Sequence, residues 1–355
     1  MSKYWSKALT DLVPYAPGEQ PKVTQLVKLN TNENPYPPSP KVASLLQHFD
    51  PDNLKRYPDP QNSALVEAIA EHANVAPNHV FIGNGSDEVL AHAFMAFFRQ
   101  PKPLLMPDIS YGFYTVYANL YGIDARPIAL RDDLSIDLRD YDSDNGGIIF
   151  ANPNAPTSLA QPLAEIEALL QRNTESVVIV DEAYVDFGAQ SAVELTARYD
   201  NCLVIQTLSK SRSLAGARIG FAIGHPDLIQ GLERIKYSFN PYSLDMLAEQ
   251  MATAAIQDRP YFDSCIKKII ATREHSTQAL RALGFNVLES KTNFLFVSHP
   301  SHRATDLMQH LRAHNIIVRH FTKPSIEHFL RISIGTDEQM QQLLECLQNY
   351  LNSQA

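Results

Sequence analysis

Lys210 is the residue whose type and position point most directly to chemistry. It follows the apolar run 203–208 and Ser209, so we expect it at the carboxyl end of a buried strand. Desolvation beside an apolar interior lowers the pKa of a lysine and favours nucleophilic or imine-forming use of its amine. Taken alone, however, a lysine at a strand end is more often a solvated charge.

Two other strand ends carry side chains that suit a planar, basic ring. Asp181 directly follows the apolar run 177–180. A carboxylate there is costly unless it meets a cation or a donor, such as a protonated ring nitrogen. The alternative is a helix-capping aspartate. Tyr111, shortly after the run 104–106, offers a face for stacking, although a lone tyrosine is more often an ordinary core or surface residue.

A phosphate site is indicated after the run 80–82. Gly83 and Gly85 permit a tight turn and Ser86 is a suitable helix N-cap, so backbone N–H groups at a positive helix end would face an anion. An ordinary capped turn is the alternative, and a dinucleotide-binding fingerprint is disfavoured because Glu88 replaces its third glycine. Arg218 could neutralise the phosphate by a bidentate fork or form a surface ion pair.

Together these features describe one cofactor. An aldehyde within reach of lysine, a basic nitrogen beside an aspartate, a stacked ring and a phosphate are the parts of pyridoxal phosphate.

The surrounding pattern predicts the elements that would position these residues. Short apolar runs alternate with helical patterns from about residue 60 to 235, which argues for an α/β fold with a mostly parallel sheet covered by helices. Ligands bind outside the carboxyl ends of strands in such sheets. The strands expected in this sheet are 80–83, 104–106, 148–151, 177–180, 203–208 and 219–223.

A smaller α/β domain is expected towards the C-terminus. It would contain strands at 285–288, 294–297, 316–319 and 330–334 and a final amphipathic helix at 337–351. The proline cluster at 34–40 marks an N-terminal arm. We therefore expect three parts, which are an arm that joins the small domain, a large cofactor-binding domain and a small C-terminal domain, over residues 1–40, 41–242 and 243–355.

Composition excludes several classes of protein. The 355 residues are 45% hydrophobic and 19% charged with a formal net charge of -9, which supplies no broad basic field for nucleic acid or an anionic membrane. Cys202, Cys265 and Cys346 have no metal-ligand spacing and are expected to be reduced thiols, with no metal site. No apolar signal segment or membrane-spanning run is found, so we expect a cytoplasmic protein.

Four segments carry a family resemblance over nearly the whole chain. They are residues 12–18, 29–36, 56–59 and 330–336. In their order and spacing the chain resembles the fold-type I pyridoxal-phosphate-dependent aminotransferases, and among these most closely the histidinol-phosphate aminotransferases.

The resemblance implies a role for each cofactor residue. Lys210 would bind the cofactor aldehyde as an imine and later move the proton at the substrate carbon. Asp181 would keep the ring nitrogen protonated, Tyr184 would donate to the phenolate oxygen and Tyr111 would stack on the ring. Phosphate contacts are implied for Ser86, Asp87, Ser209 and Arg218, and for Tyr57 from the second subunit of a homodimer.

The resemblance also implies the substrate and its contacts. Arg331 matches the arginine that pairs with a substrate carboxylate, Asn34 lies in the segment that approaches it, and Arg319 and Tyr15 match contacts to the distal phosphate of histidinol phosphate. Arg319 could equally be an exposed strand arginine. The implied reaction is amino transfer between L-histidinol phosphate and 2-oxoglutarate, giving imidazole-acetol phosphate and glutamate in histidine biosynthesis.

One motif departs from the family pattern. An asparagine and a glycine are usual on either side of Pro-Thr, where this chain has Ala155 and Ser158. Asn154 is therefore the candidate donor to the cofactor phenolate, with Tyr184 acting alone as the alternative. Asn240 and Tyr242 are expected only as residues that could line the pocket.

Three other functions stay open on this fold. They are an aromatic amino-acid aminotransferase, a phosphoamino-acid decarboxylase and a non-catalytic pyridoxal-phosphate-binding sensor. The sensor would need a nucleic-acid-binding module, which the short, proline-rich segment before residue 40 does not provide.

Overall fold

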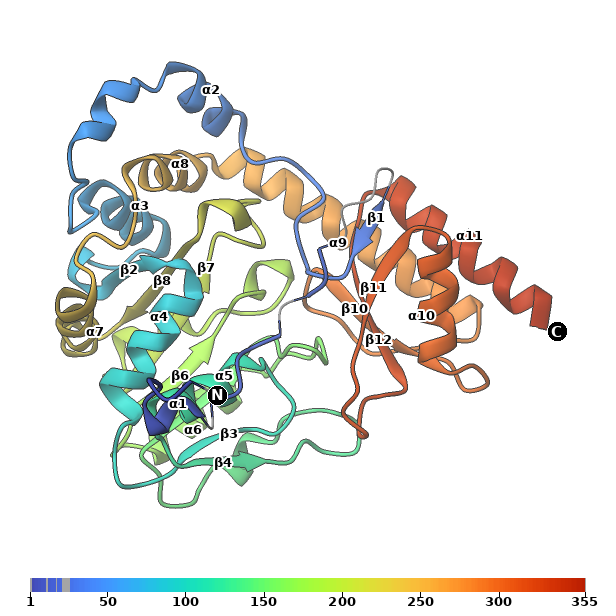
Figure 1. The fold of residues 1–355 in the computed structure, drawn as a ribbon, viewed down its shortest axis with the longest axis horizontal. Coiled ribbons are helices and arrows are strands. Elements are labelled where there is room, and N and C mark those ends of the chain that lie inside the picture. The colour runs from blue at the N-terminus through green and yellow to red at the C-terminus, as the bar shows by residue number, and fades with distance from the viewer. Residues whose placement is uncertain (1, 11, 17, 21–25, 355) are drawn as a thin grey trace.

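The computed structural model describes residues 2–10, 12–16, 18–20 and 26–354. Its larger part is a seven-stranded sheet in the order β2-β8-β7-β6-β5-β3-β4, with helices on both faces (Figure 1). Neighbouring strands are parallel except for β8, which is antiparallel to β2 and β7. The mostly parallel α/β fold expected from the sequence is therefore confirmed. The strands are β2 (Val80–Asn84), β3 (Leu104–Pro107), β4 (Ala125–Ile128), β5 (Gly147–Ala151), β6 (Val178–Asp181), β7 (Cys202–Thr207) and β8 (Ile219–Gly224).

The central strands are apolar along their length because both of their faces are covered. In β6, Val178 and Val180 belong to one buried cluster, whereas Ile179 belongs to the cluster on the opposite face. This alternation follows from the two-residue period of a strand. The helices that accompany this sheet are α3 (Ser63–Ala73), α4 (Gly85–Ala93), α5 (Phe113–Tyr121), α6 (Leu163–Arg172) and α7 (Pro226–Phe239).

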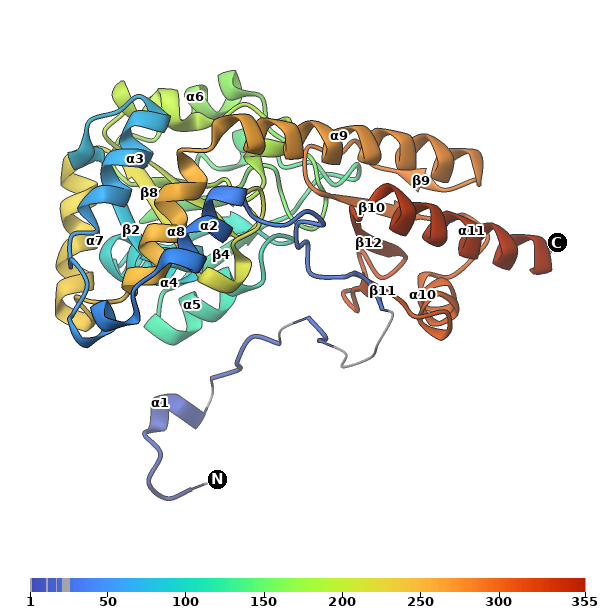
Figure 2. The ribbon, with the colours of Figure 1, turned by 90° about the horizontal axis from the view of Figure 1, so that it is seen from above.

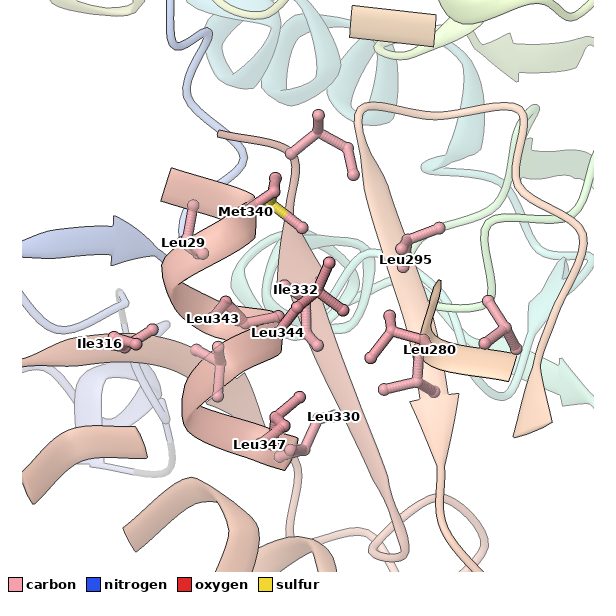
Figure 3. Close-up of a cluster of buried hydrophobic side chains, with 14 of the residues drawn as sticks. Leu29, Leu280, Leu295, Ile316, Leu330, Ile332, Met340, Leu343, Leu344 and Leu347 are labelled. Carbon is pink, nitrogen blue, oxygen red and sulfur yellow. The ribbon is translucent and has the colours of Figure 1, made fainter. Parts of the chain in front are cut away.

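A second, five-stranded sheet forms the smaller domain, in the order β1-β11-β12-β10-β9. Its apolar face is covered by α11, whose residues Met340, Leu343, Leu344 and Leu347 pack against it (Figure 3). Leu29 of β1 belongs to the same core, and β1 pairs with β11 of this sheet. The elements are β1 (Val27–Leu29), β9 (Asn286–Val287), β10 (Phe294–Ser298), β11 (Ile316–His320), β12 (Phe329–Ser333), α10 (Ala304–Ala313) and α11 (Asp337–Gln354).

The helix α8 (Met246–Ile256) packs with the large domain, so the boundary between the domains lies later in the chain than the sequence indicates. It shares a core with α2 (Pro40–His48) and α3 on the large domain, although the sequence assigned everything after residue 242 to the small one. The long helix α9 (Arg259–Ala282) then runs from the large domain to the small one (Figure 2). We therefore propose that the small domain begins within α9.

In Figure 2 the short helix α1 (Lys7–Thr10) stands apart from the body of the molecule. The three cysteines are buried free thiols. Among the described residues, no helix combines the length and the apolar character needed to cross a lipid bilayer.

Candidate active site

Two adjoining cavities lie at the carboxyl edge of the large sheet, and each has a volume of about 380 Å³. The Asp181 cavity is lined by the ends of β6 and β7 and the start of α4. The arginine cavity lies between the large domain, the small domain and the N-terminal segment, and contains Arg319 and Arg331. The residues common to both cavities are Thr31, Tyr111, Ala155, Tyr184 and Lys210.

Lys210 lies where the two cavities meet. Its Nζ donates to the carbonyl oxygen of Thr31 at 3.3 Å and lies 5.9 Å from the centre of the Tyr184 ring. The predicted strand-end position has therefore brought the amine into a half-buried site that is open to both cavities.

Asn34 has a different position from the one predicted for it. Its side-chain amide donates to the carbonyl oxygens of Lys210 and Ser211 at 3.1 and 3.2 Å, and it lines neither cavity. The prediction that Asn34 contacts the substrate is therefore not supported. Asn34 thereby ties the N-terminal segment to the backbone of Lys210 and Ser211.

Asp181 is a buried carboxylate at the floor of the Asp181 cavity. Tyr114 Oη donates to it at 2.6 Å, and the backbone N–H of Ala183 donates at 3.3 Å. Burial nevertheless raises the pKa of Asp181 to about 6, against the opposing effect of these hydrogen bonds. Among the ion pairs of the described residues none involves Asp181, so a cationic ring nitrogen would supply the charge that this carboxylate lacks.

The opposite end of the same cavity is built for an anion. The helix α4 begins at Gly85, which has a φ of 81°, and a Cβ on this residue would meet Arg218 Nη2 at 2.6 Å. A Cβ on Gly220 of β8 would come within 2.2 Å of the Ser86 nitrogen, so only glycine lets the strand approach the start of this helix. The backbone N–H groups, Ser86, Ser209 and Arg218 thereby gather at one end of the cavity.

Asp87 ties the anion end to the predicted stacking residue. Its carboxylate accepts from Tyr111 Oη at 2.7 Å and from Arg218 Nη2 at 2.9 Å. Burial, followed by the charge of Asp87, raises the pKa of Tyr111, so this hydroxyl stays protonated as a donor. The negative charge of Asp87 is thus occupied by two donors instead of facing the cavity alone.

Arg319 and Arg331 are direct cross-strand partners in β11 and β12, and both line the arginine cavity. Arg331 donates through Nη2 to the carbonyl oxygen of Asn30 at 2.9 Å, while its Nε has no partner among the described residues. Burial, with a smaller contribution from Arg319, lowers the pKa of Arg331. Like charges opposite each other destabilise a sheet, so this pair is typical of a site for an anionic ligand.

An aromatic residue, Tyr15, and a further cation, Lys323, also line the arginine cavity. Tyr15 stacks on Phe113 with ring centres 4.2 Å apart and lines the cavity. Lys323, which the sequence did not indicate, donates to the carbonyl oxygen of Asp108 at 2.6 Å and lies 3.2 Å from its carboxylate. A third cation therefore accompanies the two arginines.

The unusual segment after β5 changes one cofactor assignment. Ala155 lines both cavities, whereas Asn154 lines neither. The Asn154 amide donates to the Ile109 carbonyl at 3.0 Å and to Thr157 Oγ1 at 3.1 Å, so it is engaged away from the cavity. Asn154 therefore does not line the cavity in which its cofactor contact is predicted. Ser158, in place of the usual glycine, has a left-handed φ of 68°.

Tyr114 and Asn32, like Lys323, are site residues that the sequence pattern did not indicate. Tyr114 lies in the first turn of α5, and the packing of that helix against the sheet brings its hydroxyl to Asp181. Asn32 donates to Tyr184 Oη at 2.9 Å, a contact between residues 152 positions apart that no local pattern reveals. Tyr57, predicted to act in the other subunit, lies outside both cavities of its own chain.

The Asp181 cavity fits pyridoxal phosphate. Asp181 is a buried charge that has no cationic partner within the described part of the chain, the glycine-lined start of α4 can receive a phosphate, and Lys210 lines the same cavity. On this fold, with these groups at the carboxyl ends of the strands, the protein is a pyridoxal-phosphate-dependent enzyme of fold type I.

Comparison with known proteins specifies the family. Residues 24–347 match the family model of class I and II aminotransferases. Histidinol-phosphate aminotransferases of Chromohalobacter salexigens and Pseudomonas putida are each 55% identical, over 98% of this chain and 99% and 100% of their own length. The crystal structure of histidinol-phosphate aminotransferase from Sinorhizobium meliloti in complex with pyridoxal-5'-phosphate has a TM-score of 0.90 at 23% identity, covering 100% of this chain and 99% of that chain. The chain belongs to the class I and II aminotransferases, and within them to the histidinol-phosphate aminotransferases.

Proposed function

We propose that this enzyme transfers the amino group between L-histidinol phosphate and 2-oxoglutarate, forming imidazole-acetol phosphate and glutamate, in the biosynthesis of histidine. The observation that carries the proposal is the paired Arg319 and Arg331 in the cavity next to Lys210. The names of relatives that are 55% identical over almost their whole length support the same reaction.

The cation pair suits both substrates of this reaction. Histidinol phosphate has a phosphate and no carboxylate, whereas glutamate has two carboxylates, so one site must accept either kind of anion. A guanidinium binds phosphate and carboxylate with the same bidentate geometry. Arg331, whose Nε meets no acceptor in the described ranges, and Arg319 can therefore hold either substrate, and Tyr15 and Lys323 line the same cavity.

The chain supplies the groups that hold the cofactor and move protons. Pyridoxal phosphate, when bound, supplies an aldehyde that joins covalently to amines and a protonated ring that withdraws electrons from them. Lys210 would hold the aldehyde carbon and then carry the proton to and from the substrate carbon that bears nitrogen. Asp181 would retain the ring proton, and the start of α4 with Ser86, Ser209 and Arg218 would bind the phosphate.

We further propose a cytoplasmic homodimer in which the subunits complete each other's sites. Large apolar side chains lie exposed on the N-terminal segment, including Tyr4, Trp5 and Val13 with exposures of 83%, 52% and 70%. Tyr57 is 79% exposed and stacks on Tyr242 with ring centres 4.7 Å apart. Such exposed aromatic groups favour burial against a second copy, from which Tyr57 would reach the phosphate.

A substrate panel tests the reaction. The purified protein is loaded with pyridoxal phosphate and mixed separately with glutamate, histidinol phosphate and phenylalanine, and the conversion of the cofactor from its aldehyde to its amine form is followed by absorbance. We expect conversion with glutamate and histidinol phosphate. Conversion by phenylalanine but not by histidinol phosphate would favour an aromatic aminotransferase, release of carbon dioxide a decarboxylase, and cofactor binding without any conversion a sensor.

A further inference from the structure

The hydroxyl of Tyr184 has a partner on the protein side that fixes the direction of its hydrogen. Asn32 Nδ2 donates to Tyr184 Oη at 2.9 Å. Because the oxygen accepts this bond, its own hydrogen is free to be donated elsewhere. Tyr184 lines both cavities, so the hydrogen is available to a group bound there.

Asn32 is itself held by a buried network. Ser333 Oγ donates to Asn32 Oδ1 at 2.9 Å and accepts from the Asn32 backbone N–H at 2.8 Å. Asn293 Nδ2 donates to the Asn32 carbonyl oxygen at 3.0 Å. Since Ser333 occupies the oxygen of the Asn32 amide, the nitrogen is the end that faces Tyr184. Asn32 is 1% exposed, so water does not compete for these bonds.

The cavity beside Tyr184 lacks the amide donor that usually accompanies this tyrosine. Ala155 occupies that position and lines both cavities, and the neighbouring Asn154 is bonded to Ile109 and Thr157 instead. The Tyr184 hydroxyl is therefore the donor that remains on this side of the ring site among the residues described. The direction of the Tyr184 hydroxyl hydrogen therefore matters more here than in a site where an asparagine amide also donates to the ring oxygen.

We infer that Asn32 is a positioning residue that directs the Tyr184 hydroxyl hydrogen into the cofactor site and thereby offsets the missing amide at position 155. The inference rests on the proposed cofactor site and on the contact between Tyr184 and the phenolate oxygen that the family resemblance implies. A hydrogen bond donated to the cofactor phenolate oxygen stabilises the deprotonated form of the bound cofactor. Asn32 thus links the N-terminal segment to the acidity of the cofactor.

The test is the pH midpoint of the visible absorption of the cofactor bound to the full-length enzyme. Asn32→Gly removes the side chain but keeps the left-handed backbone, since Asn32 has a φ of 56°. We expect its midpoint to rise by about one pH unit, the equivalent of one hydrogen bond. Asn74→Gly is the matched control, because Asn74 has a φ of 54° and is exposed outside both cavities.

A double-mutant cycle separates positioning from a purely structural role. In a Tyr184→Phe background, Asn32→Gly should cause no further shift, because the hydroxyl that it orients is absent. Ala155→Asn should lower the midpoint of the Asn32→Gly variant towards that of the unmodified enzyme. If Asn32→Gly folds poorly, Ser333→Ala, which frees the Asn32 amide, should give a smaller rise in the same direction.

The outcomes distinguish this inference from the proposed cofactor site. The titratable groups around Tyr184, namely Lys210, Arg331 and Tyr114, are unchanged in these variants, so a shift belongs to the Asn32–Tyr184 pair. An unshifted midpoint in Asn32→Gly, or the same shift with and without the Tyr184 hydroxyl, overturns the role of Asn32. Absence of any cofactor absorption in the unmodified enzyme would instead overturn the cofactor site itself.

Discussion

Replacing Asp181 by asparagine should make the cofactor-free protein more stable and should weaken the binding of the cofactor. Burial raises the folded-state pKa of Asp181 from 3.8 to about 6. Because the folded pKa lies above the unfolded one, the stability associated with this group is complete below about pH 4 and is lost as the pH rises through about 6. The shift corresponds to about 3 kcal/mol, of which about half is lost between pH 5 and 7.

Asparagine keeps the acceptor for Tyr114 without the charge. The stability of Asp181→Asn relative to the unmodified protein should therefore grow by about 1.5 kcal/mol between pH 5 and 7. Urea unfolding of the two cofactor-free proteins at pH 5 and pH 7 measures this difference in stability. Cofactor affinity should fall by about 3 kcal/mol, because the ring nitrogen loses its buried counter-charge.

Glu182→Gln is the matched control. Burial also raises the pKa of Glu182, to about 7, but its side chain bonds to Ser191, Ala192 and Gln206 and does not line the Asp181 cavity. Glu182→Gln should remove a similar pH dependence of stability without lowering the affinity for the cofactor. If Asp181→Asn leaves both the pH dependence and the cofactor affinity unchanged, the buried-charge argument is refuted.

Four further substitutions test other parts of the site. Lys210→Ala should abolish transamination, and borohydride treatment should no longer fix the cofactor to the protein; covalent labelling seen by mass spectrometry would contradict this. Arg319→Gln should weaken binding of histidinol phosphate by about 2 to 5 kcal/mol, measured as the dissociation constant, if the guanidinium pairs with a desolvated phosphate. Gly220→Ala should destabilise the protein by about 1 to 3 kcal/mol in thermal unfolding, because the new Cβ would lie 2.2 Å from the Ser86 nitrogen. Gly216→Ala, where a Cβ meets nothing within 4 Å, is its control for stability. Tyr57→Phe should raise the cofactor dissociation constant up to about tenfold, the equivalent of one hydrogen bond, if the hydroxyl reaches a partner subunit's phosphate.

The positions of the cofactor residues on the sheet were predictable because they depend on local pattern. Lys210, Asp181 and Ser86 each follow a run of apolar residues that forms a strand, and parallel strands bring their carboxyl ends to one edge. The strand β4 was missed because its arginine and proline, Arg126 and Pro127, hide the apolar pattern at the edge of the sheet.

Other positions depend on contacts between segments far apart in the chain. Asn34 and Asn154 have side chains that suit ligand binding, but the fold turns both towards backbone carbonyls. Lys323 joins the arginine cavity because its loop meets Asp108 of the large domain, 215 residues away.

The sequence by itself determined the chemistry of this protein, because Lys210, Asp181 and the glycine-serine turn lie at strand ends that adjacent residues specify. Only the tertiary structure decided how that chemistry is supported. Asn32 reaches Tyr184 across 152 residues, and Ser333 reaches Asn32 across 301. Hydrogen bonds of this kind depend on the packing of the N-terminal segment between two domains, which no periodicity along the chain records.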